Sequence, residues 1–366
     1  MDDHGGRVDC PSVSGTRIDV RLTELGWNDR CAGDFEALKP GADVAPGRVV
    51  IEFNYLYRVW TEEGELETTA AGRLKHRIER RSEMPVVGDW VAVRRRSNES
   101  GVIVGVLPRH SAFSRKTAGG VTDEQIVAAN VDVAFVVMAL DADFNMRRLE
   151  RYLLLTRESG AAPVVLLTKP DLSDAVDAQR AQAAAIAGAV PVHVANPKMH
   201  IGLEQVTAYL PAGRTGALLG SSGVGKSTII NRLIGEEVQR TREVREHDSR
   251  GRHTTSHREL IVLPNGGLII DTPGMRELQL WDVGDAVRET FDDIEALAAT
   301  CHFTDCRHRD EPRCAVRAAI ALGRLAPERL ESYLKLQDEL LVLARQQEER
   351  AQLDEKRRSR RPTPKA

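Results

Sequence analysis

Hydrophobic and polar positions alternate with a period of two in short runs, at residues 49–53, 57–60, 89–93 and 101–107. This period is typical of strands with one buried face, and glycine, asparagine and glutamate turns separate the runs. About five such strands in so short a stretch predict a small β-barrel, and an OB-fold has this size. We therefore expect an all-β OB-fold over residues 46–112, after a polar N-terminal extension over residues 1–45.

From residue 131 the pattern changes to apolar runs of strand length that alternate with helical segments. The runs are VDVAFVVMAL, PVVLL, VPVHVA, TGALLG, ELIVL and GLIID. Strands that alternate with helices predict a parallel sheet covered on both faces. We expect this α/β domain over residues 131–280, with a linker over residues 113–130 before it and a helical domain over residues 281–350 after it.

Charge is unevenly distributed along the 366 residues. The net charge of −3 argues against a polyanion binder by bulk charge, but Lys and Arg outnumber Asp and Glu over residues 70–116. Such a patch indicates either a solvated face or contacts with a phosphate backbone. The basic tail at residues 351–366 has a composition that predicts disorder.

The apolar runs are shorter than the roughly 18 residues that a membrane span needs, and no signal-peptide pattern opens the chain. Five cysteines are few, and three of them lie close together near the C-terminus. This usage fits a reducing cytoplasm and a metal site better than a disulfide framework. We expect a cytoplasmic protein without a membrane partner.

The sequence GSSGVGKS matches the phosphate-binding pattern G-x-x-x-x-G-K-S between an apolar strand and a helical segment. Its glycines let backbone N–H groups converge on a β-phosphate, Lys226 supplies charge to the β- and γ-phosphates, and the Ser227 hydroxyl ligates Mg²⁺. A glycine-rich turn is the plainer interpretation, and both flanks argue against it. The predicted nucleotide contacts here are Gly220, Ser221, Ser222, Gly223, Val224, Gly225, Lys226, Ser227 and Thr228.

A second part of the site is DTPG, which directly follows the apolar run GLII. Asp271 at this strand end can hold Mg²⁺ through water, and the Gly274 N–H can meet a γ-phosphate. The loop GRHTTSHREL precedes it, and a threonine hydroxyl there can complete the Mg²⁺ shell when GTP is bound. Thr254 and Thr255 remain alternatives, and a Ser/Thr-rich loop without this role is the plainer interpretation.

The tetrapeptide TKPD indicates which base is bound. It consists of Thr168, Lys169, Pro170 and Asp171 and follows the apolar run PVVLL. The Asp171 carboxylate can accept hydrogen bonds from guanine N1–H and from the exocyclic amino group, and the Lys169 stem can lie along the ring. Adenine offers no such pair of donors, so the motif predicts guanine nucleotides, GTP and GDP.

The base-reading motif precedes the phosphate loop in this chain, whereas ordinary GTPases have the reverse order. The sheet can be the same while the chain enters it at a different strand, because chain ends lie at the surface and often near one another. We therefore expect a P-loop GTPase domain with a circularly permuted order. In this order the second switch region runs directly into the C-terminal domain, so that nucleotide state can move that domain.

A cluster of three cysteines and a histidine follows in the helical region. Cys301, Cys306, His308 and Cys314 offer three thiolates and an imidazole within 14 residues. This closed set suits one structural, tetrahedral Zn²⁺. His302 is a competing ligand on spacing alone, and buried free cysteines are the plainer interpretation.

Together these motifs resemble the circularly permuted, ribosome-small-subunit-dependent GTPases of bacteria, the RsgA or YjeQ family. The resemblance spans residues 25–333 and rests on LPRHSAFSRK, EQIVAANVD, RRLERYL, TKPDL, GSSGVGKST, GRHTTSHREL, DTPGMREL and CHFTDCRHRDEPRCAV. It implies an OB-fold, a permuted G domain and a zinc domain with His308 as ligand. It also implies slow GTP hydrolysis stimulated by the 30S subunit during its late maturation. We expect 16S rRNA as a partner and a monomeric protein.

The chain departs from the family pattern in its nucleotide site. The loop after VHV usually reads Ser-Ala but here starts at Asn196, and Thr168 stands where Asn is frequent, which is expected to weaken guanine binding somewhat. Met275 replaces the Gln with which many GTPases orient water. We therefore expect a low intrinsic rate, with Lys226 and His253 as the candidate catalytic groups; the alternative is a solvent-facing His253 and a group supplied by the ribosome.

Two other functions are compatible with parts of this pattern. An rRNA-binding module that uses GTP as a structural switch with negligible turnover would suit the basic barrel and the zinc domain. A P-loop kinase of small molecules would leave TKPD without a role. Hydrolysis with and without 30S subunits separates the first alternative from a GTPase, and nucleotide competition separates the second.

Overall fold

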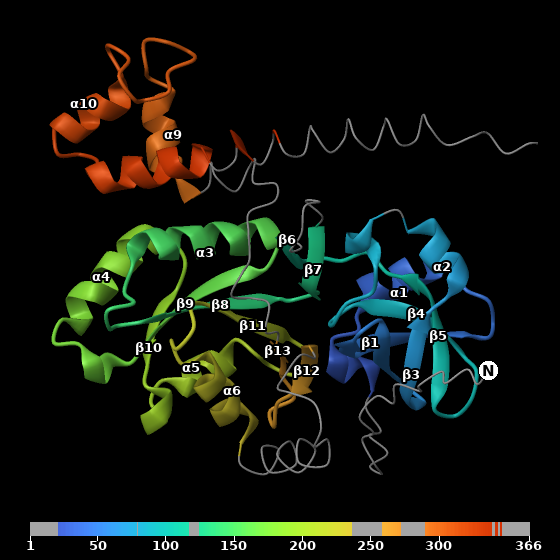
Figure 1. The fold of residues 1–366 in the computed structure, drawn as a ribbon. Helices are drawn as coiled ribbons and strands as arrows, with labels where there is room; N and C mark the ends of the chain where they lie inside the picture. Colours follow the sequence, from blue (N-terminus) through green and yellow to red (C-terminus); the bar gives the residue numbers. More distant parts are fainter. Residues whose placement is uncertain are drawn as a thin grey trace, which may run out of the picture.

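The computed structural model describes residues 21–78, 80–116, 124–235, 258–271 and 290–338, together with 341–342 and 345. Along the chain it forms a small barrel, a central α/β domain and a helical C-terminal region (Figure 1). This is the order of structural classes that the hydrophobic pattern predicted.

The barrel is built from five strands. They are β1 (Val44–Phe53), β2 (Leu56–Thr61), β3 (Gly64–Ala70), β4 (Trp90–Arg95) and β5 (Ser100–Val106). Neighbours follow the order β1-β2-β3-β5-β4, and β4 pairs back with β1, which closes the barrel. Alternate side chains point inward and form an apolar interior that includes Val49, Val59, Leu66, Val91 and Ile103. The expected OB-like barrel is confirmed.

Short helices flank the barrel. Helix α2 (Gly72–Arg77) connects β3 to β4, while η1 (Leu22–Leu25) and α1 (Asp29–Ala37) precede β1. The Asn28 side chain accepts a hydrogen bond from the Cys31 N–H and caps α1. Leu22 and Leu25 are buried in the same apolar cluster as residues of the central domain, so this part of the polar extension belongs to the folded core.

In its described residues, the central domain contains six strands of the main sheet and four α-helices. Its elements are β8 (Val133–Ala139), α3 (Met146–Ser159), β9 (Ala162–Thr168), α4 (Val176–Ala187), β10 (Val192–Ala195), α5 (Leu203–Ala208), β11 (Thr215–Leu219), α6 (Lys226–Ile234), β12 (Arg258–Val262) and β13 (Leu268–Asp271). The spatial order is β10-β9-β8-β11-β13-β12, and all pairs are parallel except β12–β13. Buried Val, Ile and Leu fill these strands, as a sheet covered on both faces requires.

Helices cover both faces of this sheet. Helices α3 and α4 lie on one side, and α5 and α6 lie on the other (Figure 1). Strand β8 shows the division directly, because Ala134, Val136 and Met138 join one apolar cluster. The intervening residues Val133, Phe135 and Val137 join the other. The predicted strand–helix alternation is therefore a two-faced, doubly covered sheet.

The barrel and the central domain share one continuous sheet. Strand β1 pairs with β12, with Ile51 opposite Glu259 and Glu52 opposite Arg258. The segment between them along the chain, expected as a linker, contains β6 (Ala112–Lys116) and β7 (Glu124–Ala129), which form a separate antiparallel pair. Backbone hydrogen bonds thus join two parts of the molecule that the sequence pattern treats as separate units.

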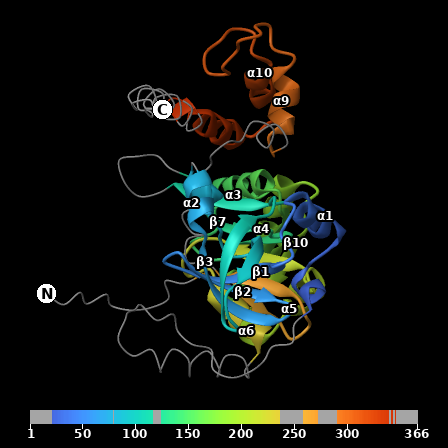
Figure 2. The same ribbon diagram turned by 90° about the vertical axis from the view of Figure 1, so that its right-hand side faces the viewer.

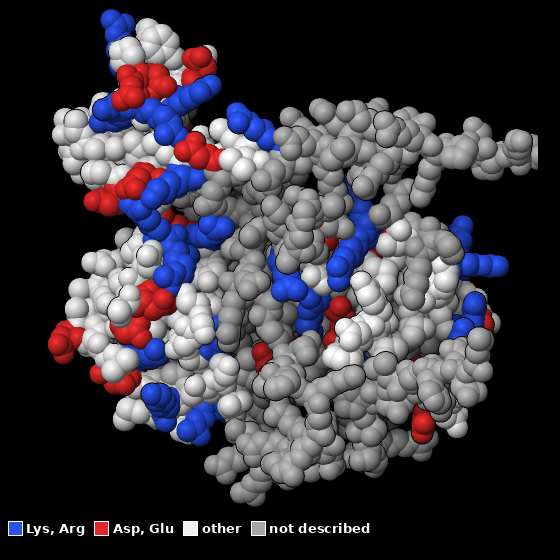
Figure 3. All heavy atoms as spheres, viewed as in Figure 1, with Lys and Arg blue, Asp and Glu red and all other residues white. Residues whose placement is uncertain are grey.

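The C-terminal region lies above α3, on the side of the central domain away from α5 and α6 (Figure 2). It contains α9 (Asp292–Ala298) and α10 (Ala315–Ala321), followed by helical residues to 338. Arg329 connects it to α3 through the carboxylate of Glu150, at 2.7 Å. Lys and Arg side chains gather where this region approaches α3 (Figure 3).

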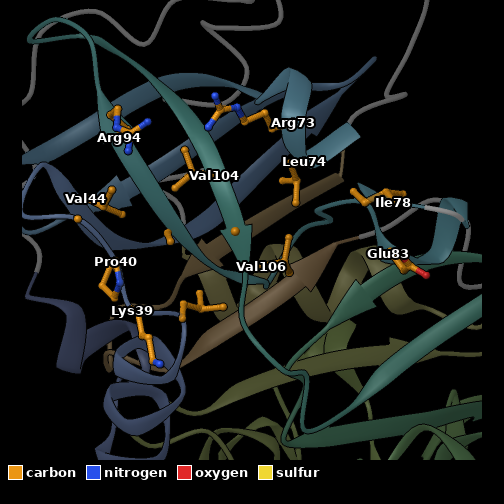
Figure 4. A pocket seen from close by; sticks show the side chains of 14 residues that line it. Lys39, Pro40, Val44, Arg73, Leu74, Ile78, Glu83, Arg94, Val104 and Val106 are labelled. Carbon is orange, nitrogen blue, oxygen red and sulfur yellow. The ribbon is translucent and has the colours of Figure 1, made fainter. Parts of the chain in front are cut away.

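A groove of about 660 Å³ opens on the barrel between α2, the chain that leads into β1, and strands β4 and β5 (Figure 4). Aliphatic side chains line it, and Lys39, Arg73 and Arg94 add positive charge. None of the predicted nucleotide or metal residues lies in it. Among the described residues, no helix is long and apolar enough to cross a membrane.

Candidate functional site: a nucleotide pocket and a metal centre

The phosphate loop connects β11 to α6 and needs glycine at defined positions. Gly220, Gly223 and Gly225 have φ angles of +147°, +82° and +102°, which residues with a Cβ rarely adopt. A Cβ at Gly220 would also lie 2.3 Å from the Val137 carbonyl oxygen. Lys226 begins α6, so the N–H groups of the first helical turn follow directly after the loop. This is the geometry of an anion site at a helix N-terminus.

Lys226 is folded over its own loop. Its Nζ donates hydrogen bonds to the carbonyl oxygens of Gly220 and Ser221, at 2.6 and 2.5 Å. The side chain is half-buried, whereas Ser227 at the next position is exposed. The one positive charge of the loop motif is therefore concentrated inside the loop, where the sequence pattern predicts phosphate.

Thr168 joins the base-reading motif to the phosphate loop. Its side chain is fully buried, and its hydroxyl donates to the Val224 carbonyl oxygen at 2.6 Å. Its own carbonyl accepts from the Leu140 N–H, which fixes the end of β9 against β8. From the sequence alone, this threonine was expected only as a shorter substitute for asparagine. In the structure it bridges the base-reading motif and the phosphate loop.

Lys169 and Asp171 follow at the turn after β9. Lys169 has a left-handed backbone, with φ of +56°, and its Nζ donates to Asp141 at 2.7 Å. This hydrogen bond holds the pKa of the Asp141 carboxyl below its usual range. Asp171 lies within the short helix η3 (Pro170–Leu172) and its carboxylate is exposed, as a group that meets a ligand must be.

Asn196 supplies the partner of Asp171. Its Nδ2 donates to Asp171 Oδ1 at 2.8 Å, and its side chain is buried. Backbone hydrogen bonds between Asn196 and Ile201 close the loop after β10. A Cβ at Gly202 would lie 2.7 Å from the Val194 carbonyl oxygen, so glycine is required there. The sequence pattern indicated this loop but no particular residue in it. The available signal was a polar side chain directly after a strand.

Arg148 is a contact that the sequence analysis missed. It lies in the first turn of α3, where the Asn145 side chain caps the helix. Its guanidinium donates to the Ser221 hydroxyl at 2.5 Å and forms an ion pair with Asp143. An arginine from the helix that faces the C-terminal region therefore touches the phosphate loop. Its place within the motif RRLERYL was the only signal in the sequence.

Of the remaining predicted nucleotide residues, some are described by the structure and others are not. Asp271 ends β13, beside β11, so it lies at the same edge of the sheet as the phosphate loop. His253, Thr254, Thr255 and Gly274 lie outside the described residues.

The four predicted metal ligands come together in the C-terminal region. One ligand atom from each of Cys301, Cys306, His308 and Cys314 lies within 4.8 Å of the others. The sulfur atoms of Cys301 and Cys314 are 3.9 Å apart. Zn–S bonds of about 2.3 Å in a tetrahedron place sulfur atoms about 3.8 Å apart, so the donor set fits Zn²⁺ in both chemistry and size.

Local structure prepares these ligands for a metal. The Ala315 N–H, at the start of α10, donates to the Cys301 sulfur at 3.3 Å. The Glu311 carboxylate accepts from the backbone N–H groups of Arg307 and Arg309 and holds the loop in place. Burial lowers the pKa of His308, which favours the neutral imidazole that binds metals.

Comparison with known proteins identifies the family of the chain. A family model described as RsgA GTPase matches residues 106–281. The small ribosomal subunit biogenesis GTPase RsgA of Opitutus terrae is 46% identical over 336 residues, 89% of this chain and 91% of that protein. Among solved structures, YjeQ from Thermotoga maritima matches with a TM-score of 0.60 at 27% identity, over 81% of this chain and 99% of that one.

A second solved structure bears on the order of the strands. YloQ, described as a circularly permuted GTPase, matches with a TM-score of 0.56 at 24% identity, over 81% of this chain and 95% of that one. In the present chain β11, which leads into the phosphate loop, lies between β8 and β13 although it follows β8, β9 and β10 in sequence. The predicted permutation is confirmed, and the chain belongs to the RsgA GTPase family.

Proposed function

We propose that the chain hydrolyses GTP slowly while bound to the small ribosomal subunit and assists the late maturation of that subunit. The hydrogen bond from Thr168 to Val224 supports this most directly, because it joins the guanine-reading motif to the phosphate loop. A P-loop kinase of small molecules needs no such connection. The name of the Opitutus relative, small ribosomal subunit biogenesis GTPase, supplies the partner.

Guanine selectivity rests on Asp171 in this proposal. Asn196 donates to one carboxylate oxygen and so orients the group, and the other oxygen and the remaining lone pairs would accept from the base. Lys169, held by Asp141, lies along the base. Guanine satisfies the carboxylate with two N–H donors, whereas adenine would leave this charged group unpaired.

Phosphate binding requires Lys226 to change partners. Its Nζ leaves the carbonyl oxygens of Gly220 and Ser221 and contacts the β- and γ-phosphates, while the loop N–H groups surround the β-phosphate. The hydroxyl of Ser227, with Asp271 and either Thr254 or Thr255, would hold Mg²⁺, which neutralises phosphate charge. Gly274 and Thr228 complete the proposed contacts.

Hydrolysis needs a group that orients water. Met275 lacks the hydrogen-bonding atoms for this, and His253 is the nearest titratable candidate in the sequence. A group from the ribosome is the alternative. Either arrangement gives a low rate in the free protein and a higher rate on the 30S subunit.

The other parts of the proposal concern the partner and the metal. The barrel and the C-terminal region contact 16S rRNA, and Cys301, Cys306, His308 and Cys314 hold one structural Zn²⁺. The donor set and its spacing support zinc over metals that prefer oxygen ligands. The protein acts as a monomer in the cytoplasm.

Replacing Asp171 with Asn tests base selection. The variant presents one donor to guanine, so GTP affinity falls by roughly 10²-fold, while xanthosine triphosphate, whose C2 oxygen accepts that donor, binds better. Asp174→Asn, an exposed neighbour, is the matched control and leaves both affinities unchanged. Equal GTP binding by the Asp171 variant and the wild type would refute the assignment.

Turnover with saturating 30S subunits tests the enzymatic role. Wild-type hydrolysis rises when subunits are added, and His253→Ala lowers the stimulated rate by roughly 10²-fold with GTP affinity nearly unchanged. A wild-type rate in this variant would mean that a ribosomal group, and not His253, orients the attacking water. If 30S subunits did not stimulate hydrolysis by the wild type, the protein would instead be an RNA-binding module that uses GTP as a structural switch.

A further inference from the structure

The groove on the barrel has an open strand edge along it. Strand β5 pairs with β3 as far as Ile103, which lies opposite Ala70, and then continues through Val104–Val106 beyond the end of that pairing. These last three residues of β5 all line the groove. A strand that has lost one neighbour offers backbone N–H and C=O groups to another segment. The groove can therefore accept an extended peptide as an added strand.

Aliphatic side chains lie beside this edge (Figure 4). Val44, Leu74 and Ile78 are half-buried, and Leu38 is 42% exposed. The groove volume of about 660 Å³ lies within the range of ligand sites in proteins, roughly 300–1,000 Å³. A segment with apolar side chains at alternate positions would remove this apolar surface from water.

Positive charge borders the aliphatic part of the groove. In Figure 4, Arg73 and Arg94 lie above the aliphatic side chains and Lys39 lies below them. No ion pair between described residues involves Lys39 or Arg73, and the pair of Arg94 with Asp43 is more than half exposed. Glu83 is the acidic residue among those that line the groove. The groove therefore favours a segment that carries carboxylates.

Residues 1–13, which lie outside the described residues, have the matching charge. They contain Asp2, Asp3 and Asp9 against a single arginine. The other end of the chain, residues 351–366, is rich in Lys and Arg and would be repelled by the groove. Of the two ends of the chain, charge therefore selects the first.

The same segment has the hydrophobic pattern of a short edge strand. Val8 and Cys10 alternate with Arg7 and Asp9. In an extended conformation the two apolar side chains would lie on one face and the two charged side chains on the other. The segment can therefore present an apolar face to the groove and keep its charges at the rim.

The segment is also long enough to reach the groove. The described chain begins at Arg21, and η1 follows directly and is joined to the barrel where Leu25 accepts a hydrogen bond from Arg48. The preceding 20 residues span up to about 66 Å when extended. This is about twice the length of the ten-residue strand β1, so every face of the barrel lies within reach.

We propose that residues 1–13 dock in the groove as a short strand along Val104–Val106. Their apolar side chains cover the aliphatic residues, and their aspartates contact Lys39 and Arg73. The docked segment closes this face of the barrel in the free protein. This contact goes beyond the proposed GTPase activity, because no residue proposed for GTP or metal binding takes part in it.

Hydrogen exchange of the protein with and without residues 1–13 tests the docking. In the full-length chain the backbone amides of Val104–Val106 exchange at least about 10-fold more slowly than in the truncated chain, because docking protects them. The difference does not depend on protein concentration, since the segment and the groove belong to one molecule. GDP affinity is the same in both chains, which shows that the truncated chain is folded.

A charge exchange within the full-length chain identifies the contact. Arg73→Glu brings the exchange of Val104–Val106 close to the rate of the truncated chain, because glutamate repels Asp2 and Asp3. The combination of Arg73→Glu with Asp2→Arg and Asp3→Arg restores slow exchange. Arg96→Glu, which changes an exposed arginine outside the groove, is the matched control and leaves the exchange unchanged.

Equal exchange rates in the full-length and truncated chains would overturn the proposal. Protection that appears only at high protein concentration would also overturn it, because a second copy of the chain would then fill the groove. The same conclusion follows if the charge exchange does not restore protection, since the segment would then stabilise the barrel without contacting the cations of the groove.

Discussion

The central domain is attached to its two neighbours in different ways. The barrel is joined by a shared sheet, in which β1 pairs with β12 through the backbone. Across the same junction the buried guanidinium of Arg48 donates to the carbonyl oxygens of Leu25, Gly88 and Asn130 and to the Thr215 hydroxyl. Backbone pairing and a fully buried, many-partnered side chain fix the barrel in one orientation.

The C-terminal region is attached mainly through α3. Arg329 reaches Glu150 across this boundary, Arg147 pairs with Glu331, and Arg157 donates to Thr290. These hydrogen bonds, between described residues, all join side chains. The pair of Arg147 and Glu331 is about half exposed, so water and salt weaken it.

The difference assigns different mechanical roles to the two neighbours. We expect the barrel to move with the central domain as one body, because its sheet is continuous with that of the GTPase domain. The C-terminal region is held by side chains on the helix whose residue Arg148 also touches the phosphate loop at Ser221. A change in that loop on GTP binding can therefore alter the contacts of the C-terminal region through α3. We expect the nucleotide state to change the position of the C-terminal region rather than that of the barrel.

The largest expected effect is the removal of the Zn²⁺ that we propose for the site of Cys301, Cys306, His308 and Cys314. Structural zinc binding provides roughly 10–16 kcal/mol of folding free energy, so a strong chelator should unfold the C-terminal region. The barrel and the central domain should stay folded, because none of the four ligands lies in them. Limited proteolysis should show cleavage beyond residue 290 with the remainder intact and GTP binding retained. If the chelator also unfolded the barrel and the central domain, the C-terminal region would not be attached more independently than the barrel.

Arg48→Met should have the next largest effect, on the barrel junction. The substitution leaves buried carbonyl oxygens without a donor and should lower the free energy of unfolding by about 3–5 kcal/mol. Urea denaturation measures this. Arg30→Met, on the exposed face of α1, is the control and should change stability by no more than about 0.5 kcal/mol. An unchanged midpoint for Arg48→Met would mean that the shared strand alone fixes the barrel.

Arg329→Met should loosen the C-terminal attachment. Glu150 is 5% exposed, and loss of its partner leaves a buried carboxylate, at a cost of about 2–3 kcal/mol. Hydrogen exchange should become faster in α9 and at the surface of α3, with no change in the barrel. Arg329→Lys keeps the charge but loses the hydrogen bond to the Thr290 carbonyl oxygen. Its hydrogen exchange should be faster than that of the wild type and slower than that of Arg329→Met. Faster exchange in the barrel as well would show that the junctions are coupled.

Arg147→Ala should have the smallest effect. Its exposed pair with Glu331 contributes less than about 1 kcal/mol, and added salt should remove the difference from the wild type. Hydrogen exchange of the residues around Glu331 at low and high salt measures this. A large effect that persists at high salt would place this pair among the main contacts of the junction.

Much of the site could be predicted because its motifs are local. Gly220, Gly223 and Gly225 were predictable from spacing, since the loop conformation itself demands glycine. The grouping of the four proposed metal ligands was predictable for the same reason, as they fall within one short segment. Asn196 was not predictable as the partner of Asp171, because they lie 25 residues apart and meet only when β9 and β10 pair.

The sequence by itself determined the classes of structure, and it supplied the residues that we propose for phosphate, guanine and metal binding. Strand and helix periods, turn glycines and ligand spacing act over a few residues and leave their pattern in the chain. Tertiary structure alone decided that β11 lies between β8 and β13, and that β1 extends the sheet at β12. Such contacts join residues as far apart as Glu52 and Arg258, which are separated by 206 positions. Nearly every residue carries the same backbone N–H and C=O groups, so these groups do not specify which strands pair. The packing of side chains over the whole chain selects the strand partners and their register.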